Sequence, residues 1–490
     1  MRYLVVGSGV AAAASARALL ATGAEVTVTD RRAGPATEAL AAAGARVVVG
    51  DPAPLSLLDE ADDVIVSPGV PPHDRLAAAA VAAGHDVYCE PELAWRLRDA
   101  GAPPWLAITG TNGKTTTTTM LAAILSAAGH VTAAVGNVGE PLAGPITRSD
   151  GGAEVLAVEL SSFQLYWSAT MAPQVGAILN FADDHLEWHG NFDAYTTAKL
   201  AIWRSAAPGG TGIAIGNLDD PLVAAALAGV PGATVGLTLA EPKPGQLGVV
   251  DGMLVDFVDW RRFPGRAGWA RDGGRVEWVC RGVIPEGEED GVPVPLFEAG
   301  SVRPAGAHNV SNALAAAAAA RAYGVPAAAV RQGLAGYAPE PHRNAPVATV
   351  DGVVYVNDSK ATNPHAAAAS LRAYPSIVWV AGGQLKGVDV DGLVAEIASR
   401  LRGVVLLGVD RAEIAAALAR HAPDVPVIDI ASTDDGAMAE VVRAAARLAR
   451  AGDTVLLAPA AASKDMYKGY DARGDAFAAA VRALEPAAGR

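Results

Sequence analysis

Short apolar runs that end in polar or glycine-containing turns and lead into alanine-rich stretches recur along the chain. Runs of this length are typical of buried parallel strands, and the stretches after them are typical of helices that cross back over a sheet. The alternation predicts a doubly wound α/β architecture. The expected strands are Tyr3–Val6, Val26–Thr29, Val47–Val49, Val64–Val66, Trp105–Thr109, Val155–Leu160, Val175–Asn180, Val353–Asn357, Ile377–Ala381, Val404–Leu407 and Thr454–Ala458.

Breaks in this pattern predict three domains. The break at Gly101-Ala102-Pro103-Pro104 ends the first set of strands, and another break lies near Pro304. A length of 490 residues agrees, because a typical domain has about 150 residues. The expected domains are residues 1–102, 103–303 and 304–490, and the third is expected to begin with the alanine-rich helix Asn312–Tyr323.

Residues 236–300 differ from the rest, with several Pro, Gly and Trp residues and the acidic run Glu286–Asp290. They predict a β-rich lobe with an exposed loop. The N-terminus has two interpretations, a signal peptide or a strand, turn and helix. The glycines of Gly7-Ser8-Gly9 and the charge of Arg17 interrupt the apolar stretch, which favours the second.

The charge balance narrows the possible partners. The chain has 38 Lys and Arg against 52 Asp and Glu, a net charge of −14, which argues against nonspecific binding to nucleic acid or anionic lipid. A small anionic ligand stays possible, because it needs only local backbone N–H groups. The pattern has no unbroken apolar span of about 20 residues, so membrane insertion is not expected. Cys89 and Cys280 are too few for a disulfide framework, which favours a cytoplasmic location.

A phosphate-binding loop is the strongest motif. It follows the apolar strand Trp105–Thr109, where successive N–H groups and a lysine would hold phosphates and a threonine hydroxyl would bind Mg²⁺. The loop is a variant of the Walker A motif, because Ile108 stands where that motif has glycine. Its residues are Gly110, Thr111, Asn112, Gly113, Lys114, Thr115 and Thr116.

A second glycine turn, Gly7–Ala12, matches the pattern G-x-G-x-x-A after the first strand. Asp30 lies about 20 residues further on, where a ribose-binding acid would lie. The motif alone leaves three possibilities open: a nicotinamide cofactor, another nucleotide, or glycines that serve packing only.

Three further residues of the middle domain are candidates for chemistry. Glu159 ends an apolar strand in the domain with the phosphate loop, which favours a metal ligand. His185 follows two acids after the next strand, which favours a metal or substrate role over a structural one. By the pattern alone, Lys199 is an ordinary helix-surface lysine.

In the third domain, Asn312 is either a helix cap or a ligand, and Arg343 offers a fork of donors suited to phosphate. Polar turns at 357–363, 382–387 and 460–465 each follow a predicted strand. The carboxyl ends of parallel strands share one rim of a sheet, where α/β proteins bind ligands.

Taken together, these motifs resemble the Mur ligases, the ATP-dependent amide-forming enzymes of peptidoglycan precursor synthesis. The resemblance is strongest to the members that add D-glutamate, and it covers nearly the whole chain except 236–300. The segments that carry it are 110–115, 159–165 (Glu-Leu-Ser-Ser-Phe-Gln-Leu), 307–314 (Ala-His-Asn-Val-Ser-Asn-Ala-Leu), 341–343 (Pro-His-Arg), 357–363 (Asn-Asp-Ser-Lys-Ala-Thr-Asn) and 463–468 (Ser-Lys-Asp-Met-Tyr-Lys).

The resemblance implies a Rossmann-like N-terminal domain, a central P-loop ATPase-type domain and a Rossmann-like C-terminal domain. It implies that ATP, with Mg²⁺, phosphorylates the carboxylate of UDP-N-acetylmuramoyl-L-alanine. The amine of D-glutamate would then attack the acyl phosphate and release phosphate. The role would lie in cytoplasmic cell-wall synthesis, and hence in cell shape and division, with a monomer as the expected state.

The resemblance also assigns residues. Lys114 would hold the outer phosphates, Thr115 and Glu159 one Mg²⁺, and His185 a second, while Lys199 would be carbamylated and bind metal. The set expected to act in catalysis is thus Lys114, Lys199 and His185. Residues expected at ATP besides the loop are Asn312, Arg343 and Asp358; at D-glutamate, Thr362, Lys386, Ser463 and Tyr470; at the UDP-sugar, Asp30, Arg31, Ser67, Gly69, Asn137 and Gly139.

Four positions depart from the family pattern: Ala11, Ala182, Asp183 and Tyr470. They place single contacts in question rather than the reaction. The alternatives are another Mur-type or folylpolyglutamate-type amide ligase, a nicotinamide-dependent dehydrogenase built on Gly7–Ala12, and a nucleotide-binding module without turnover.

Overall fold

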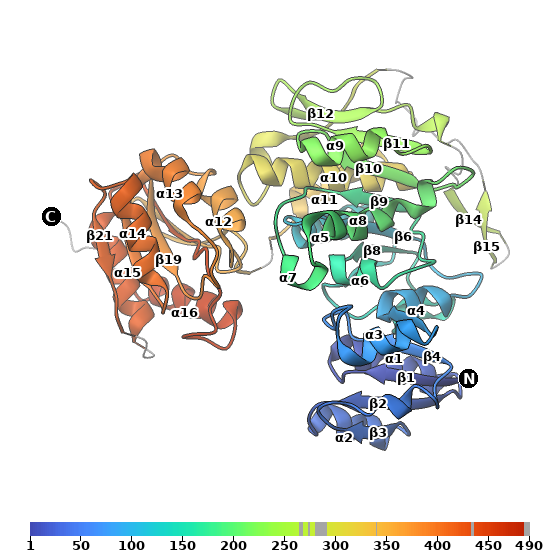
Figure 1. The fold of residues 1–490 in the computed structure, drawn as a ribbon. Helices are drawn as coiled ribbons and strands as arrows, with labels where there is room; N and C mark the ends of the chain where they lie inside the picture. The colour runs from blue at the N-terminus through green and yellow to red at the C-terminus, as the bar shows by residue number, and fades with distance from the viewer. Residues whose placement is uncertain (264–267, 273–274, 280–291, 340, 433–435, 485–490) are drawn as a thin grey trace. The chain divides into compact units, whose positions relative to one another are not determined.

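The computed structural model describes residues 1–263, 268–272, 275–279, 292–339, 341–432 and 436–484. The chain folds into two compact units, one of Met1–Ala299 with Ser311–Tyr337 and one of Gly300–Val310 with Ala338–Arg490 (Figure 1). The first unit holds an N-terminal and a middle sheet, and the second holds a C-terminal sheet. The predicted α/β class is confirmed.

The N-terminal sheet has five parallel strands, all within residues 2–89, in the order β3-β2-β1-β4-β5. The first strand ends at Val6 and the first helix begins at Val10, so the predicted strand, turn and helix are confirmed. The strands are β1 (Arg2–Val6), β2 (Glu25–Asp30), β3 (Arg46–Val49), β4 (Asp63–Val66) and β5 (Asp86–Cys89). The helices are α1 (Val10–Ala21), α2 (Pro35–Ala42) and α3 (Arg75–Ala82).

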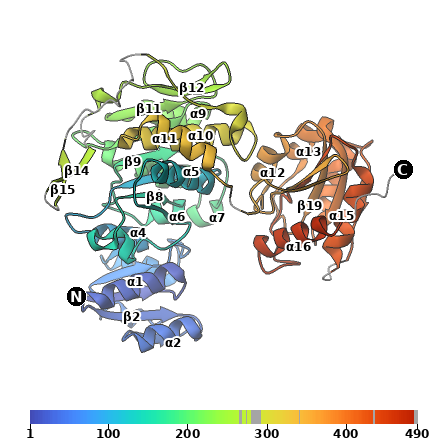
Figure 2. The ribbon, with the colours of Figure 1, turned by 180° about the vertical axis from the view of Figure 1, so that it is seen from behind.

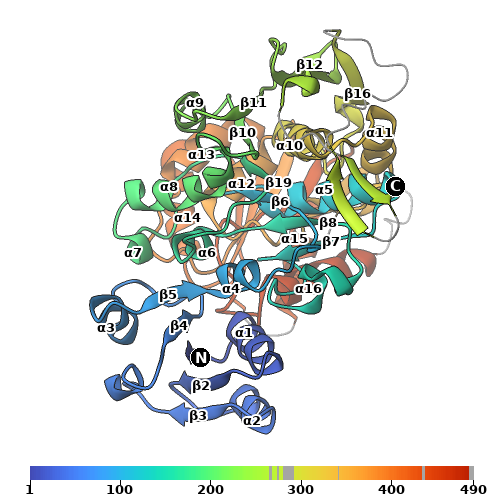
Figure 3. The same cartoon turned by 90° about the vertical axis from the view of Figure 1, so that its right-hand side faces the viewer.

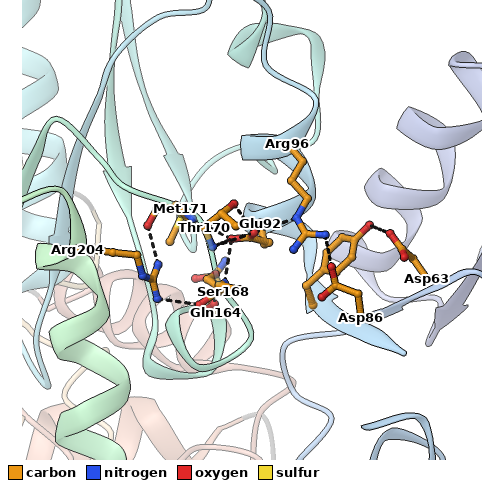
Figure 4. Close-up of polar contacts among 11 residues, drawn as sticks. Asp63, Asp86, Glu92, Arg96, Gln164, Ser168, Thr170, Met171 and Arg204 are labelled. Carbon is orange, nitrogen blue, oxygen red and sulfur yellow. Dashed lines mark hydrogen bonds and ion pairs between the residues drawn. The ribbon is translucent and has the colours of Figure 1, made fainter. Parts of the chain in front are cut away.

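Helix α4 (Glu90–Arg96) leads from the N-terminal sheet to the middle sheet, and a buried carboxylate fixes it there (Figure 4). The Glu92 carboxylate accepts hydrogen bonds of 3.0 to 3.1 Å from the backbone N–H groups of 169–171. The Thr170 hydroxyl and the Arg96 guanidinium donate two more, at 2.6 and 2.9 Å. Burial raises the pKa of Glu92, but these donors outweigh it and lower the pKa overall.

Two arginines add further contacts around Glu92, one to the N-terminal sheet and one to the middle domain (Figure 4). Arg96 donates to Asp86 over 2.6 Å and lies 4.0 Å above the ring of Tyr88, both on β5. Arg204, from the 3₁₀ helix Ala201–Ala206, donates to the carbonyl oxygens of Met171 and Ser168 over 2.7 and 2.9 Å. The loop 168–171 is therefore one of the segments that attach the N-terminal sheet to the middle sheet.

Within the described residues the middle sheet has nine strands, in the order β16-β13-β12-β11-β10-β9-β6-β8-β7. The strands from β6 to β12 run parallel, and β13 and β16 continue the sheet antiparallel. Figure 3 shows β6, β8 and β7 beside helix α5. The strands are β6 (Trp105–Thr109), β7 (Thr132–Gly136), β8 (Val155–Glu159), β9 (Val175–Ile178), β10 (Ile213–Asn217), β11 (Ala233–Leu237), β12 (Gln246–Val250), β13 (Met253–Phe257) and β16 (Val294–Glu298).

The β-rich character predicted for 236–300 is confirmed by β12, β13 and β16 and by the separate hairpin of β14 (Gly268–Asp272) and β15 (Arg275–Val279). The run Glu286–Asp290 and Cys280 lie outside the described residues. The helices of this domain are α5 (Lys114–Ala127), α6 (Ser162–Tyr166), α7 (Leu186–His189), α8 (Phe192–Leu200) and α9 (Pro221–Ala228).

Helices α10 (Ala307–Tyr323) and α11 (Ala327–Gly336) differ from the expected grouping. From Ser311 onward they belong to the first unit, where α11 packs beside α5 (Figure 2). The side chains of 313–320 are fully buried. Arg321 donates to Asp256 of β13 over 2.7 Å in a buried ion pair. The alanine-rich helix expected at the start of the third domain therefore covers the middle sheet.

The C-terminal unit has a six-stranded sheet among its described residues, in the order β17-β18-β22-β19-β20-β21. Strands β18, β22, β19, β20 and β21 run parallel, and β17 is antiparallel to β18. The strands are β17 (Ala345–Val350), β18 (Val353–Asn357), β19 (Ile377–Gly382), β20 (Leu401–Leu407), β21 (Val427–Asp429) and β22 (Thr454–Leu457). The helices are α12 (Pro364–Leu371), α13 (Asp391–Ile397), α14 (Arg411–His421), α15 (Ala437–Leu448) and α16 (Tyr470–Arg482).

In the described part of the chain, no helix combines the length and the apolar character that crossing a membrane requires.

Candidate functional site

The predicted phosphate loop joins the buried strand β6 to helix α5, so its backbone lies at the N-terminus of a 14-residue helix. Gly113, the residue before α5, has φ = 85°, a conformation that favours glycine. An added Cβ there would also clash with the side-chain oxygen of Asn312 on α10. The structure thus brings Asn312, predicted at the nucleotide, against the phosphate loop.

The loop is held by the segment that follows β9. Asn112 and Asn180 exchange two hydrogen bonds, from the Asn112 N–H over 2.8 Å and from the Asn180 amide over 3.1 Å. The hydroxyl of Thr111 accepts the N–H of Ala182 over 2.9 Å and lies 2.8 Å from the Tyr195 hydroxyl. The loop therefore has a fixed shape before any phosphate binds, which lowers the entropic cost of binding.

Lys114, the first residue of α5, folds back over this loop. Its Nζ donates to the carbonyl oxygens of Gly110 and Thr111 over 2.9 and 2.8 Å. A positive charge and the N–H groups at a helix N-terminus together favour an anion at this place. Thr115 and Thr116 follow on α5 and are both buried.

Glu159, at the end of β8, is a buried carboxylate with one oxygen satisfied and one not. Its Oε1 accepts a 2.7 Å hydrogen bond from the side chain of Asn137, which was predicted on the UDP-sugar side. Its Oε2 is fully buried and has no hydrogen-bond partner among the residues that the structure describes. A buried carboxylate oxygen without a partner is costly, so Glu159 is suited to binding a cation.

The sequence pattern around Lys199 predicts an ordinary surface lysine, and this prediction is wrong. It lies on α8 with 2% of its surface exposed, and its Nζ donates to the carbonyl oxygen of Gly110 over 2.8 Å. Burial, then the neighbouring Lys114, holds the pKa of Lys199 well below its usual value, although Asp184 and Glu159 oppose the shift. The shift makes the neutral amine easier to reach than in an exposed lysine.

His185 adopts a left-handed backbone conformation, with φ = 55°, just before α7. Its ring lies 4.7 Å from the ring of Phe163, and its Nε2 lies 3.4 Å from Asp184. Burial lowers the pKa of His185, and the charges of Lys114 and Lys199 lower it further. Lys114, Glu159, His185 and Lys199 thus form one electrostatically linked cluster beside the loop.

The site fits a Mg²⁺ ion, because the cluster offers the unpartnered oxygen of Glu159 and Thr115, in the first turn of α5, would add a hydroxyl. Among the residues that the structure describes, no group of three or more His, Cys, Asp and Glu side chains lies close enough to hold a metal. Metal binding here would therefore need ligands from the nucleotide phosphates as well. The metal roles of His185 and Lys199 stay predictions.

At the carboxyl edge of the N-terminal sheet lies a cavity of about 410 Å³, lined by Asp30, Arg31 and Gly69 among others. Asp30 accepts a 2.6 Å hydrogen bond from the Ser8 hydroxyl. Burial raises the pKa of Asp30, but this bond and nearby backbone N–H groups lower it overall, so the carboxylate stays charged. Ser67 lies against Gly7 at the same edge.

Asn137 and Gly139 follow the carboxyl end of β7, in the middle domain. Gly139 has φ = 64°, and a Cβ there would clash with the backbone oxygen of Ala134. Asn137 is tied to Glu159 not only through its side chain but also by its N–H, which donates to the Glu159 carbonyl over 2.9 Å. A predicted substrate residue thereby adjoins the predicted metal ligand.

In the C-terminal unit, the three predicted polar turns do share one rim, because β18, β22 and β19 are neighbours and run parallel. The backbones of Gln384 and Ala462 exchange hydrogen bonds of 2.8 and 2.9 Å across this rim. Thr362, Ser463 and Lys386 follow β18, β22 and β19 respectively. Ser463 is buried and Lys386 is exposed.

Asp358, directly after β18, is fully buried. Its carboxylate accepts hydrogen bonds from the Ser370 hydroxyl and from the N–H of Asn344, the latter over 2.9 Å. Burial raises the pKa of Asp358 to about 7, although these bonds and the charge of Arg343 act in the opposite direction. Tyr470 begins α16, and the Nζ of Lys360 lies 3.9 Å above its ring.

Arg473 was not predicted as a functional residue; it lies one turn into α16 with 1% of its surface exposed. Its guanidinium donates to the hydroxyl and the carbonyl of Ser359, over 3.0 and 2.9 Å, and to the carbonyl of Ala461 over 3.1 Å. It therefore links the turns after β18 and β22. A basic residue in an amphipathic helix normally points to solvent, so only the fold identifies it.

Profiles of known domains match three successive parts of the chain. Residues 1–89 match "Mur ligase MurD-like, N-terminal domain", residues 108–241 match "Mur ligase middle domain", and residues 342–461 match "Mur ligase, glutamate ligase domain".

Curated relatives resemble the chain over nearly its whole length. One from Thermobifida fusca is 51% identical, covering 99% of this chain and 98% of the relative. One from Streptomyces avermitilis is 49% identical, covering 98% and 97%. Both carry the name UDP-N-acetylmuramoylalanine--D-glutamate ligase.

Solved structures share the fold at low identity. The UDP-N-acetylmuramate-alanine ligase of Thermotoga maritima matches with a TM-score of 0.55 and 17% identity, covering 99% of this chain and all of that one. A pseudomurein peptide ligase of Methanothermus fervidus matches with a TM-score of 0.51 and 20% identity, covering 93% and 96%.

Proposed function

Because the chain belongs to the Mur ligase family, we propose that it uses ATP to join D-glutamate to UDP-N-acetylmuramoyl-L-alanine. Relatives about 50% identical over their full length carry the name of this reaction. The product is a precursor of peptidoglycan. We place the reaction in the cytoplasm, as part of the cell-wall synthesis that supports cell shape and division, and expect the enzyme to act as a monomer.

A carboxylate is a poor electrophile, so the reaction needs a leaving group. In the proposed mechanism the substrate carboxylate takes the terminal phosphoryl group of ATP, and the amine of D-glutamate then attacks the acyl phosphate and expels phosphate. The phosphate loop fixes the nucleotide, and Lys114 stabilises the negative charge on the transferring group. Mg²⁺, held by Thr115 and Glu159, would neutralise further phosphate charge.

The remaining roles come from the family resemblance, and the positions of the residues support them. Asp30, Arg31, Ser67, Gly69, Asn137 and Gly139 are proposed to bind the UDP-sugar, in part through the cavity beside Asp30. Thr362, Lys386, Ser463 and Tyr470 are proposed to bind D-glutamate from the rim of the C-terminal sheet. Arg343 and Asp358 are proposed to reach the nucleotide from the same unit. The carbamylation of Lys199 is supported by the burial of its amine and by its lowered pKa.

The observation that carries the proposal is the buried, unpartnered oxygen of Glu159 beside a preformed phosphate loop. A nicotinamide dehydrogenase would leave both features without a purpose. A nucleotide-binding module without turnover would have no need for the second substrate cavity at Asp30.

The test is a phosphate-release assay with UDP-N-acetylmuramoyl-L-alanine, ATP and one amino acid at a time. We expect turnover with D-glutamate and at least 100-fold less with L-glutamate, L-alanine or meso-diaminopimelate. Preference for one of these others would indicate another ligase of the family. Binding of ATP without phosphate release from any mixture would contradict an enzymatic role.

A further inference from the structure

Two tryptophans hold the loop that follows β4. The indole N–H of Trp188 donates to the carbonyl oxygen of Gly69 over 3.1 Å, and that of Trp167 donates to the carbonyl oxygen of Val70 over 3.1 Å. Both side chains are buried. Gly69 lines the cavity beside Asp30, so the loop is part of the proposed UDP-sugar site.

The tryptophans come from the middle domain, close to the proposed chemistry. Trp188 lies three residues after His185, on α7, and Trp167 follows α6. The ring of Phe163 packs against both Trp188 and His185, with centroids 4.6 and 4.7 Å apart. One continuous set of contacts therefore runs from the carbonyl of Gly69 through Trp188 and Phe163 to His185.

These side chains are suited to hold the loop after β4 at a fixed distance from His185. An indole is rigid and large, and its N–H must find an acceptor when it is buried, so its position is well defined. The backbone N–H of Cys89, at the end of β5, also donates to the Trp167 carbonyl over 3.1 Å, which fixes the backbone of Trp167 as well. Displacement of a substrate by about 1 Å can reduce a rate about 100-fold, so such a spacer has kinetic consequences.

We propose that Trp188 is a positioning residue, which sets the UDP-sugar loop at the correct distance from His185 and the phosphate loop, with Trp167 as a second support. This inference rests on the proposed function. It predicts that loss of the indole N–H changes the use of the UDP-sugar while the use of ATP stays the same, because the phosphate loop has its own supports at Asn180 and Ala182.

The test compares Trp188→Phe with Trp203→Phe. Trp203 is a matched control, because its buried indole donates to the carbonyl of Gly176 over 2.9 Å, within the core of the middle domain. Loss of one buried hydrogen bond corresponds to about a fivefold to 100-fold change in an equilibrium constant. We expect KM for UDP-N-acetylmuramoyl-L-alanine to rise about tenfold in Trp188→Phe, with KM for ATP unchanged, and neither KM to change in Trp203→Phe.

Trp167→Phe, measured in the same way, keeps the test decisive if Trp188→Phe does not fold. A smaller rise in the same KM is expected for it. The inference fails if the UDP-sugar KM of the folded variants equals that of the wild type, or if Trp203→Phe raises it equally. Absence of turnover in the wild-type enzyme would instead contradict the proposed function, and the two failures are therefore distinguishable.

Discussion

The Nζ of Lys199 donates a 2.8 Å hydrogen bond to the carbonyl oxygen of Gly110, the first residue of the phosphate loop. A lysine with 2% exposure that contacts a phosphate loop is costly to retain for stability alone, because burial disfavours its charged form. Its burial at this place points to a role in the reaction.

We therefore expect Lys199→Met to separate activity from stability. Turnover should fall at least ~100-fold, the scale of losing one electrostatic group in an active site. The free energy of unfolding should stay equal or rise by up to about 4 kcal/mol, as when buried charges are replaced by apolar side chains of similar volume. Phosphate release and urea unfolding measure the two quantities. A variant with wild-type turnover would exclude Lys199 from the mechanism.

Lys114→Ala should remove the cation from the phosphate loop. We expect kcat to fall at least ~100-fold in the phosphate-release assay, because the transferring phosphoryl group loses its counter-charge. Lys243→Ala is the control, since Lys243 is an exposed lysine of the same domain. Equal activity of the two variants would contradict the role given to Lys114.

Asp256→Ala should destabilise the first unit. Asp256 and Arg321 form a 2.7 Å ion pair with 1% and 2% of their side chains exposed, and removing one member leaves a buried charge. Such a change costs about 3–5 kcal/mol. Asp259→Ala breaks part-exposed pairs with Arg261 and Arg262 and a cap hydrogen bond from the Arg261 N–H, and should cost about 0.5–2 kcal/mol. Urea unfolding of both variants compares the two costs, and similar values would contradict the burial argument.

Glu90 should give stability a measurable pH dependence. Burial raises its pKa from 4.5 to about 7, although hydrogen bonds from the N–H groups of Ala143 and Leu142 act against the shift. The folded state thus binds a proton that the unfolded state has lost, so Glu90 favours the fold most below pH 4.5. As the pH rises from 4.5 to 7 this contribution is lost, and the free energy of unfolding falls by about 3 kcal/mol.

The variant Glu90→Gln isolates this effect, because its side chain stays neutral. Urea unfolding at pH 5 and pH 8 should show a smaller loss of stability in the variant than in the wild type. An equal loss in both proteins would show that groups other than Glu90 cause the pH dependence.

The order of strands and turns was predictable because β-branched runs and glycine turns are local signals. The phosphate loop, Glu159 and the rim at 357–363 follow their strands as the sequence indicates. The position of α10 was not predictable. Its residues 313–320, nearly all alanine, are buried on every side, so the sequence shows no amphipathic face that would indicate against which sheet the helix packs.

Polar contacts between residues far apart in the sequence were not predictable either. Glu92 stands in the run Glu90-Pro91-Glu92, which looks like a solvated helix start, yet the loop at 169–171 buries it. Trp188 and Gly69 are 119 positions apart, and an indole donor leaves no periodic pattern. The local sequence predicts an exposed Lys199, because its burial depends on the fold around Gly110. Only the family resemblance indicated its role.

The tryptophan contacts at the loop after β4 also give the protein an optical property. The chain has nine tryptophans, and Trp188 is one whose N–H bonds directly to a loop proposed to contact substrate. Indole emission shifts with the polarity and hydrogen bonding around the ring. The difference between the emission of the wild type and that of Trp188→Phe would therefore report occupancy of the UDP-sugar loop, without any attached dye and before catalysis begins.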